Sequence, residues 1–129
     1  MRRLSDRLFE SRRERILALV TALPGASVIA GGDSHFSFKV RGKTFGYFLD
    51  DHHGDGRVAL NCKTADGAHE TLATVAPDRF FIPAYVGARG WLGLWVDLPK
   101  IDWSEVEDVI IEAHRLVAPH ALLTERKKT

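Results

Sequence analysis

The sequence contains a single cysteine, Cys62, among its 129 residues. One thiol cannot form a disulfide within the chain, and it cannot supply a zinc site that needs several cysteines. No run of residues approaches the roughly 18 to 20 apolar positions that a membrane-spanning helix requires. The net charge is also small, at +1, so attraction to a polyanion would have to come from a local basic patch. These absences favour a cytoplasmic protein with no membrane association, no disulfide, no cofactor and no metal.

The N-terminal region has only some features of an export signal. Basic residues precede an apolar run, but Asp6, Glu10 and Glu14 lie within the basic part, and Pro24-Gly25 interrupts the apolar part. We therefore expect an ordinary first helix that ends before Pro24-Gly25, because its apolar residues recur at helical spacing. Its arginines would lie on the opposite face, where they are either solvated or in contact with phosphate groups.

Alternation of apolar and polar residues predicts an antiparallel sheet of about five strands, at residues 27–30, 35–40, 44–49, 57–63 and 91–96. The alternation assigns one face to Phe36, Phe38, Val40, Phe45, Tyr47, Leu49, Val58, Leu60 and Cys62. The intervening residues point to the opposite face, which we expect to be open to water.

Two further helices are predicted from their ends. Asp66 and Asp102 each stand where an N-terminal cap is expected, and a proline follows each helix. Glu105 lies three positions after Asp102, which is the spacing of a capping box. No repeat, linker or low-complexity segment divides the chain. We therefore expect residues 1–129 to form one two-layer α+β domain, with the helices packed on one face of the sheet.

The densest apolar stretch spans residues 80–98, FFIPAYVGARGWLGLWVDL. It contains the pattern Pro83-x-Tyr85-x-Gly87-x-x-Gly90-Trp91, and Asp102-Trp103 and Arg115-Leu116-Val117-Ala118-Pro119 follow it. This combination resembles the MmcQ/YjbR family over nearly the whole chain. The resemblance implies an α+β fold whose architecture is similar to type III secretion chaperones and frataxin-like domains. It also implies DNA binding, the function in the family's descriptive label.

The open face of the sheet is the leading candidate for a functional site. Cations beside exposed aromatic rings often hold single-stranded nucleic acid, because the charges follow phosphates and the rings stack on bases. Alternatively, the turn at residues 41–43 would enter a duplex groove as a wing. A structural interpretation is also open, in which the tryptophans pack against the segment around Tyr85 or against a second subunit. The candidate nucleic-acid-binding residues are Lys39, Arg41, Lys43, Arg57, Lys63, Arg89, Trp91 and Trp95.

Signals for catalysis or metal binding are weak. The segment DDHHGDG at residues 50–56 is rich in carboxylates and imidazoles, but it lacks the spacing of a calcium loop, so we interpret it as an acidic turn. Cys62 is expected to be buried with a raised pKa, unlike a nucleophile. Gly87 and Gly90 lack the third glycine of a dinucleotide-binding loop, and we expect them to shape the turn before Trp91.

The sequence therefore predicts a non-catalytic protein that binds nucleic acid, most simply DNA, on the open face of its sheet. The alternative is a protein-interaction module, chaperone-like or homodimeric, that uses the same aromatic surface and has no role with nucleic acid. Salt separates the two hypotheses, because contacts with phosphate weaken steeply as its concentration rises and apolar contacts do not.

Overall fold

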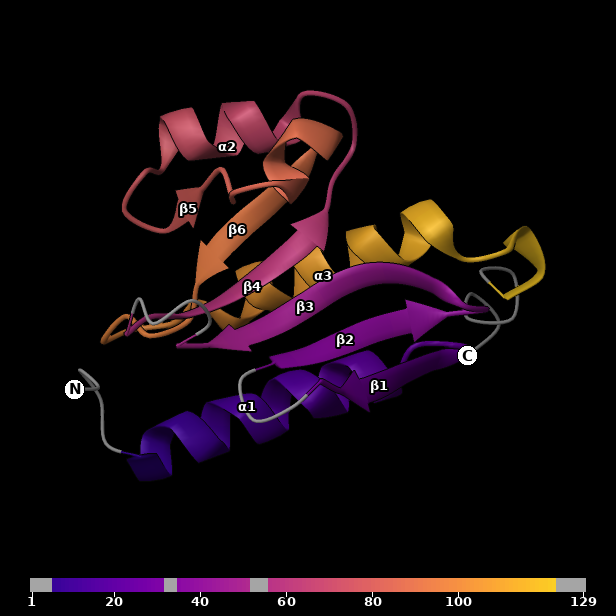
Figure 1. Cartoon of the computed structure of the whole chain (residues 1–129), viewed down its shortest axis with the longest axis horizontal. Coiled ribbons are helices and arrows are strands. Elements are labelled where there is room, and N and C mark those ends of the chain that lie inside the picture. Colours follow the sequence, from indigo (N-terminus) through magenta and orange to yellow (C-terminus); the bar gives the residue numbers. More distant parts are fainter. Residues whose placement is uncertain (1–5, 32–34, 52–55, 123–129) are drawn as a thin grey trace.

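The structure, a computed structural model, describes residues 6–31, 35–51 and 56–122. Within these ranges no helix has the length and apolarity needed to span a membrane. The elements in chain order are α1 (Asp6–Thr21), β1 (Ala26–Ala30), β2 (His35–Val40), β3 (Lys43–Asp50), β4 (Val58–Lys63), α2 (Ala68–Val75), β5 (Phe80–Phe81), the 3-10 helix η2 (Val86–Arg89), β6 (Trp91–Trp95) and α3 (Trp103–Val117) (Figure 1).

The strands form one sheet with the order β1-β2-β3-β4-β6-β5, and every pairing in it is antiparallel. The predicted α+β class is confirmed. The sheet has one strand more than the sequence predicted, because β5 consists of two residues within the aromatic stretch. Phe80 of β5 pairs with Leu94, and Phe81 pairs with Gly93.

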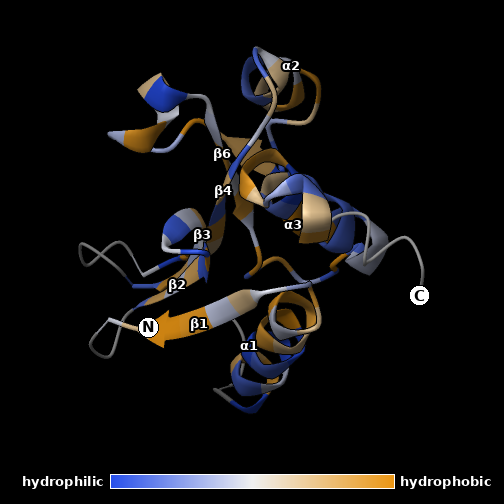
Figure 2. Ribbon diagram, turned by 90° about the vertical axis from the view of Figure 1, so that its right-hand side faces the viewer, coloured by the Kyte–Doolittle hydropathy of each residue, from blue (hydrophilic) through white to orange (hydrophobic). Residues whose placement is uncertain are grey.

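The helices α1 and α3 cover the same side of the sheet, as Figure 2 shows. Their apolar side chains meet the inward side chains of the strands, so the core lies between one layer of helices and one layer of strands. The side chains at its centre include Phe9, Ile16, Val20, Phe38, Phe45, Leu60, Leu92, Val106 and Ile110.

A β-bulge in β3 changes which side chains face the core. Phe38 pairs with Gly46 and Lys39 pairs with Thr44, so Phe45 is an extra residue without a partner on β2. Because side chains alternate along a strand, one extra residue reverses the faces of all that follow. The prediction that Tyr47 faces the core, together with Leu49, was therefore wrong. Both side chains lie on the opposite face, and Phe48 takes the buried position instead.

The caps of α3 and α2 differ from each other. Asp102 caps α3 as predicted, because its Oδ1 atom accepts hydrogen bonds from two backbone N–H groups at 3.0 and 3.3 Å. The side chain of Glu105 does not complete a capping box and instead accepts a hydrogen bond from Nε of Arg79 at 3.0 Å. Asp66 does not cap α2. That position belongs to Gly67, whose φ is 76°.

Arg12 joins α1 to the end of β6. Its guanidinium donates hydrogen bonds to the backbone oxygens of Val96 at 2.8 Å, Leu98 at 2.6 Å and Pro99 at 3.2 Å. Burial lowers the pKa of Arg12, and the negative charge of Asp97 opposes that shift. The expectation that the arginines of this helix lie on a solvated face was therefore wrong for Arg12, because three backbone oxygens need its donors.

Candidate functional site

The face of the sheet opposite α1 and α3, hereafter the outer face, is defined by the strand register. Directly paired residues in antiparallel strands share a face, so each pair extends the set from one strand to the next. The outer face carries Ser27, Ile29, His35, Ser37, Lys39, Thr44, Tyr47, Leu49, Ala59, Asn61, Lys63, Phe81, Trp91, Gly93 and Trp95.

Trp91 belongs to the outer face but is not available to solvent. It is 4% exposed, and its ring centre lies 5.6 Å from that of Tyr47, with 31° between the two planes. Tyr47 occupies this position only because the bulge turns it outward. A base could stack on the Trp91 ring only if the side chains above it moved away.

Trp95 is enclosed by two neighbours. The ring of Phe81 stacks on it with a centre-to-centre distance of 4.0 Å, and the guanidinium carbon of Arg57 lies 3.7 Å from the ring centre. Two groups this close to one ring must cover its opposite faces. The structure therefore leaves neither face of the Trp95 ring open for a base.

Arg57 is held by an acidic partner. Its Nε and Nη2 atoms donate hydrogen bonds to the two carboxylate oxygens of Asp97, at 2.7 and 2.9 Å. Asp97 is 2% exposed and also accepts a hydrogen bond from the backbone N–H of Val58 at 3.0 Å. This two-pronged geometry fixes the guanidinium above Trp95, and the carboxylate balances its charge.

The other candidate cations lie at one end of the sheet. Arg41 and Gly42 form the turn between β2 and β3, with φ angles of 51° and 79°, so the exposed side chains of Arg41 and Lys43 lie at this end. Lys39 of β2 and Lys63 of β4 are half-buried on the outer face near the same end. Arg89 is exposed and directly precedes Gly90, whose carbonyl oxygen accepts a hydrogen bond from the N–H of Thr64 at 3.2 Å. The structure thus places five of the six candidate cations at the same strand ends.

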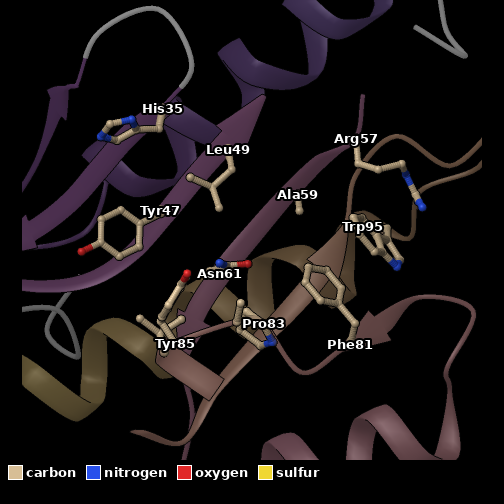
Figure 3. A pocket seen from close by; sticks show the side chains of 12 residues that line it. His35, Tyr47, Leu49, Arg57, Ala59, Asn61, Phe81, Pro83, Tyr85 and Trp95 are labelled. Carbon is tan, nitrogen blue, oxygen red and sulfur yellow. The ribbon is translucent and has the colours of Figure 1, made fainter. Parts of the chain in front are cut away.

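A pocket of about 410 Å³ opens on the outer face. The residues that line it include Tyr47, Leu49, Asn61, Phe81, Tyr85 and Trp95. In Figure 3 the amide of Asn61 lies between Tyr47 and Tyr85 on one side and Phe81 and Trp95 on the other. Asn61 is 7% exposed, and its Oδ1 atom has no hydrogen-bond partner among the described residues. The outer-face pocket therefore combines aromatic walls with one buried, unpaired acceptor.

Tyr85 stands at the edge of this pocket in an unusual backbone conformation. Its φ and ψ are 66° and −65°, and the N–H of Val86 donates a hydrogen bond to the carbonyl oxygen of Ala84 at 2.7 Å. This is a γ-turn with positive φ, which is rare and strained for a residue with a side chain. Tyr85 is nevertheless 85% exposed. The turn holds a large aromatic ring in solvent beside the pocket.

Gly93 explains how Phe81 reaches Trp95. A Cβ atom at position 93 would lie 2.3 Å from the ring of Phe81, so only glycine lets that ring lie flat across the sheet. The sequence singled out neither Phe81 nor Gly93, because their proximity depends on the pairing of β5 with β6. A glycine between two tryptophans in a predicted strand was the available signal, since glycine there often marks a close approach.

The other residues that the sequence raised as candidates for chemistry include Cys62, Gly90 and the acidic segment. Cys62 is fully buried as predicted, and burial raises the pKa of its thiol to about 12, so it is not a nucleophile near neutral pH. Gly90 adopts a φ of 84° at the end of η2, in agreement with a role in the turn before Trp91. Most of the acidic segment at 50–56 lies outside the described residues. Among the residues that are described, no three His, Cys, Asp or Glu side chains gather in a way that could hold a metal.

The sheet order and the position of the helices define a two-layer α+β domain with an aromatic pocket on its outer face. The chain belongs to the YjbR family, whose model matches residues 21–116. Its fold is similar to the crystal structure of Deinococcus radiodurans protein DR2400, which has the family-model domain DUF419. The TM-score is 0.68 and the identity 13%, over 81% of this chain and 77% of that chain. A comparison with curated proteins found no match.

Proposed function

We propose that this is a non-catalytic cytoplasmic protein whose outer face binds single-stranded nucleic acid, most simply DNA. The observation that carries this proposal is the presence of Lys39 and Lys63 on the same face as a pocket walled by aromatic side chains. Lys63 lies two residues along β4 from the pocket residue Asn61, and Lys39 lies two residues along β2 from Ser37, which pairs with the pocket residue Tyr47. Two residues of a strand span about 7 Å. Phosphates held by the lysines would therefore keep neighbouring bases within reach of the pocket.

A single strand fits this face better than a duplex. A base can enter the pocket only when it is unpaired and unstacked. The alternative of a groove-binding wing finds little support, because the turn between β2 and β3 adds only Arg41 and Gly42 beyond the paired residues Val40 and Lys43. Arg41, Lys43 and Arg89 are suited to further phosphate contacts. Arg57 and Trp95 line the pocket, and Trp91 supports Tyr47 beside it.

Fluorescence anisotropy with labelled single- and double-stranded oligonucleotides tests the proposal. We expect micromolar or tighter binding to the single strand at about 50 mM salt, and a steep loss at about 200 mM, because phosphate contacts release counterions. The double variant Lys39→Glu with Lys63→Glu should lose binding while its thermal midpoint stays within a few degrees of the unmodified protein. Both side chains are partly exposed and lie outside the core.

A second charge-reversed protein controls for the change in total charge. Arg7→Glu with Lys100→Glu alters the net charge by the same amount at exposed positions away from the outer face. We expect this variant to bind the single strand with nearly unchanged affinity. Equal losses in the two double variants would mean that total charge, and not the outer face, determines binding.

A protein partner is the second candidate, and the exposed apolar side chains favour it. Ile29 and Ile82 are 48% and 46% exposed, and Ile29 shares the outer face with Tyr47. Exposed apolar side chains that form one contiguous patch are typical of interaction surfaces. No binding of any oligonucleotide at low salt would contradict the nucleic-acid proposal. Sedimentation of the protein as a salt-insensitive dimer would then support a homodimer formed through this surface.

A further inference from the structure

We infer that the outer-face pocket holds one unpaired base, with the amide of Asn61 at its edge and the ring of Tyr85 against its face. This inference rests on the proposed function and adds to it a site that distinguishes a base from the backbone that carries it.

The first argument concerns the unpaired acceptor of Asn61. Burying a polar atom without a partner destabilises a protein, and most buried polar atoms in folded proteins are therefore hydrogen-bonded. Ala59 and Gly93 on the neighbouring outer-face positions show that small apolar residues are compatible with this part of the sheet. A residue with only a packing role at position 61 would not need an amide. The unpaired Oδ1 atom is explained if a ligand supplies an N–H donor.

The second argument concerns the shape and lining of the pocket. Its volume of about 410 Å³ is within the range of roughly 300 to 1,000 Å³ that is typical of small-ligand sites. Its walls include the flat side chains of Tyr47, Phe81 and Trp95, and Asn61 is a polar group among them. Aromatic walls beside a hydrogen-bonding amide favour a flat ring with polar atoms on its edge.

The third argument concerns Tyr85. Strained backbone conformations persist where the surrounding structure holds them, and they gather at ligand-binding sites. The γ-turn is held on both sides: the N–H of Gly87 bonds to the carbonyl oxygen of Pro83 at 2.9 Å, and Gly87 packs so tightly on Ile82 that a Cβ would lie 2.5 Å from it. This arrangement keeps the Tyr85 ring at the pocket edge, where it can stack on a ring that enters.

The chemistry of a base matches both groups. An amide offers an acceptor and two donors, and asparagine pairs with the adjacent donor and acceptor on a base edge through two parallel hydrogen bonds. Every base also has an aromatic face on which tyrosine stacks. Lys39 and Lys63, on the same face, lie where the phosphates next to the bound base would run.

The test compares a labelled 12-residue oligonucleotide with a backbone of the same length that carries no bases. Both strands have the same phosphates, so the ratio of their affinities measures the contribution of the bases alone. Because stacking on an aromatic side chain contributes about 1 to 3 kcal/mol per base, we expect the intact strand to bind at least about fivefold more tightly to the unmodified protein.

Two variants test whether the pocket is responsible for the difference in affinity between the intact and base-free strands. Asn61→Leu removes the amide but keeps the volume, and we expect it to weaken binding of the intact strand about two- to tenfold. Tyr85→Gly removes the ring and relieves the positive φ, and we expect a loss of about fivefold or more. Tyr85→Phe keeps the ring and should bind as the unmodified protein does. Binding of the base-free strand should not change in any of them.

Stability measurements separate a binding role from a packing role. Asn61→Leu and Tyr85→Gly should have thermal midpoints equal to or above that of the unmodified protein, because one removes an unpaired buried acceptor and the other a strained turn. A lower midpoint together with weaker binding of both strands would assign these residues to packing and overturn the inference.

The remaining outcomes are equally distinct. Equal affinity for the intact and base-free strands would overturn the base site and leave the proposed function of the outer face intact. A high ratio that neither Asn61→Leu nor Tyr85→Gly lowers would place the base contact elsewhere and also overturn it. If neither strand binds at low salt, the proposed function fails and the base site fails with it.

Discussion

Trp91 and Tyr85 are six positions apart in the chain, yet their surroundings are opposite. Trp91 lies beneath Tyr47 and is almost inaccessible, whereas Tyr85 extends into solvent. We predict that Trp91→Ala lowers the free energy of unfolding by about 3 to 5 kcal/mol, because it leaves a cavity under the side chains that cover it. Urea denaturation followed by far-UV circular dichroism measures this loss.

Val75 supplies the matched control, because it is a large apolar residue that is mainly exposed. Val75→Ala should change the free energy of unfolding by less than about 0.5 kcal/mol. A loss below about 1 kcal/mol for Trp91→Ala would show that the outer face tolerates the absence of this ring, and Trp91 would then be a surface residue.

At the residue scale, the sequence predicts which face of a regular strand a side chain occupies better than it predicts which distant residues that side chain contacts. Alternation correctly placed Lys63 of β4 on the outer face, and Asn61 with it, because β4 has no irregularity. It gave no indication that Arg57 is held by Asp97, since those residues are forty positions apart. The exposed position of Tyr85 depends on a γ-turn, for which the local sequence contains no clear signal.

Among the secondary-structure elements, α1 packs apolar side chains against the sheet and is also joined to the end of β6 by Arg12. Arg12→Ala removes the guanidinium donors that bond to the carbonyl oxygens of Val96, Leu98 and Pro99. Hydrogen bonds from a charged group contribute about 1.5 to 3 kcal/mol, so we predict a loss of more than about 2 kcal/mol of stability. Amide hydrogen exchange should also become faster in α1 than in α3.

Arg7 is the control for this prediction, because it lies on the same helix and is exposed. Arg7→Ala should have little effect on stability or on amide exchange. If the two variants lose the same stability, the contacts of Arg12 contribute nothing beyond those of a surface arginine.

The elements themselves were mostly predictable, and the exceptions have physical causes. Periodicity identified α1, α3 and the longer strands, because each buries one face against a common core. It missed β5, because two residues contain no period. It also assigned Tyr47 to the wrong face, because the bulge at Phe45 interrupts the alternation that the prediction assumed. Gly46 was the only local hint of that bulge.

For the whole molecule, we propose that residues 1–129 form one domain, and cooperative unfolding tests this. Each layer contacts the other through long-range pairs such as Phe45 of β3 with His114 of α3, whose ring centres are 5.6 Å apart. We predict that tryptophan fluorescence and far-UV circular dichroism report the same urea midpoint, because small domains with one core unfold in a single step. Two separate midpoints would mean that the sheet and helices unfold independently.

Membership of the YjbR family accounts for the architecture of the molecule, and its binding chemistry has to be argued from the outer face itself. The similarity to the Deinococcus radiodurans structure extends over most of both chains at 13% identity. At that identity, a core pattern is enough to maintain the fold, whereas a pocket depends on individual residues such as Asn61 and Tyr85. The fold was therefore predictable from the sequence, and the pocket required the geometry.

The bulge at Phe45 also gives the gene a place in β3 where its length can change without disturbing the outer face. Removing the codon for Phe45 would restore strict alternation, with Gly46 still opposite Phe38 and Tyr47 still opposite Ser37, so Tyr47 and Leu49 would stay on the outer face and Phe48 in the core. The pocket would keep this wall and Trp91 its cover, and the loss would fall on the core, where one buried ring would be missing. In evolution, a single in-frame deletion at this point would therefore lower stability and leave the binding face in place.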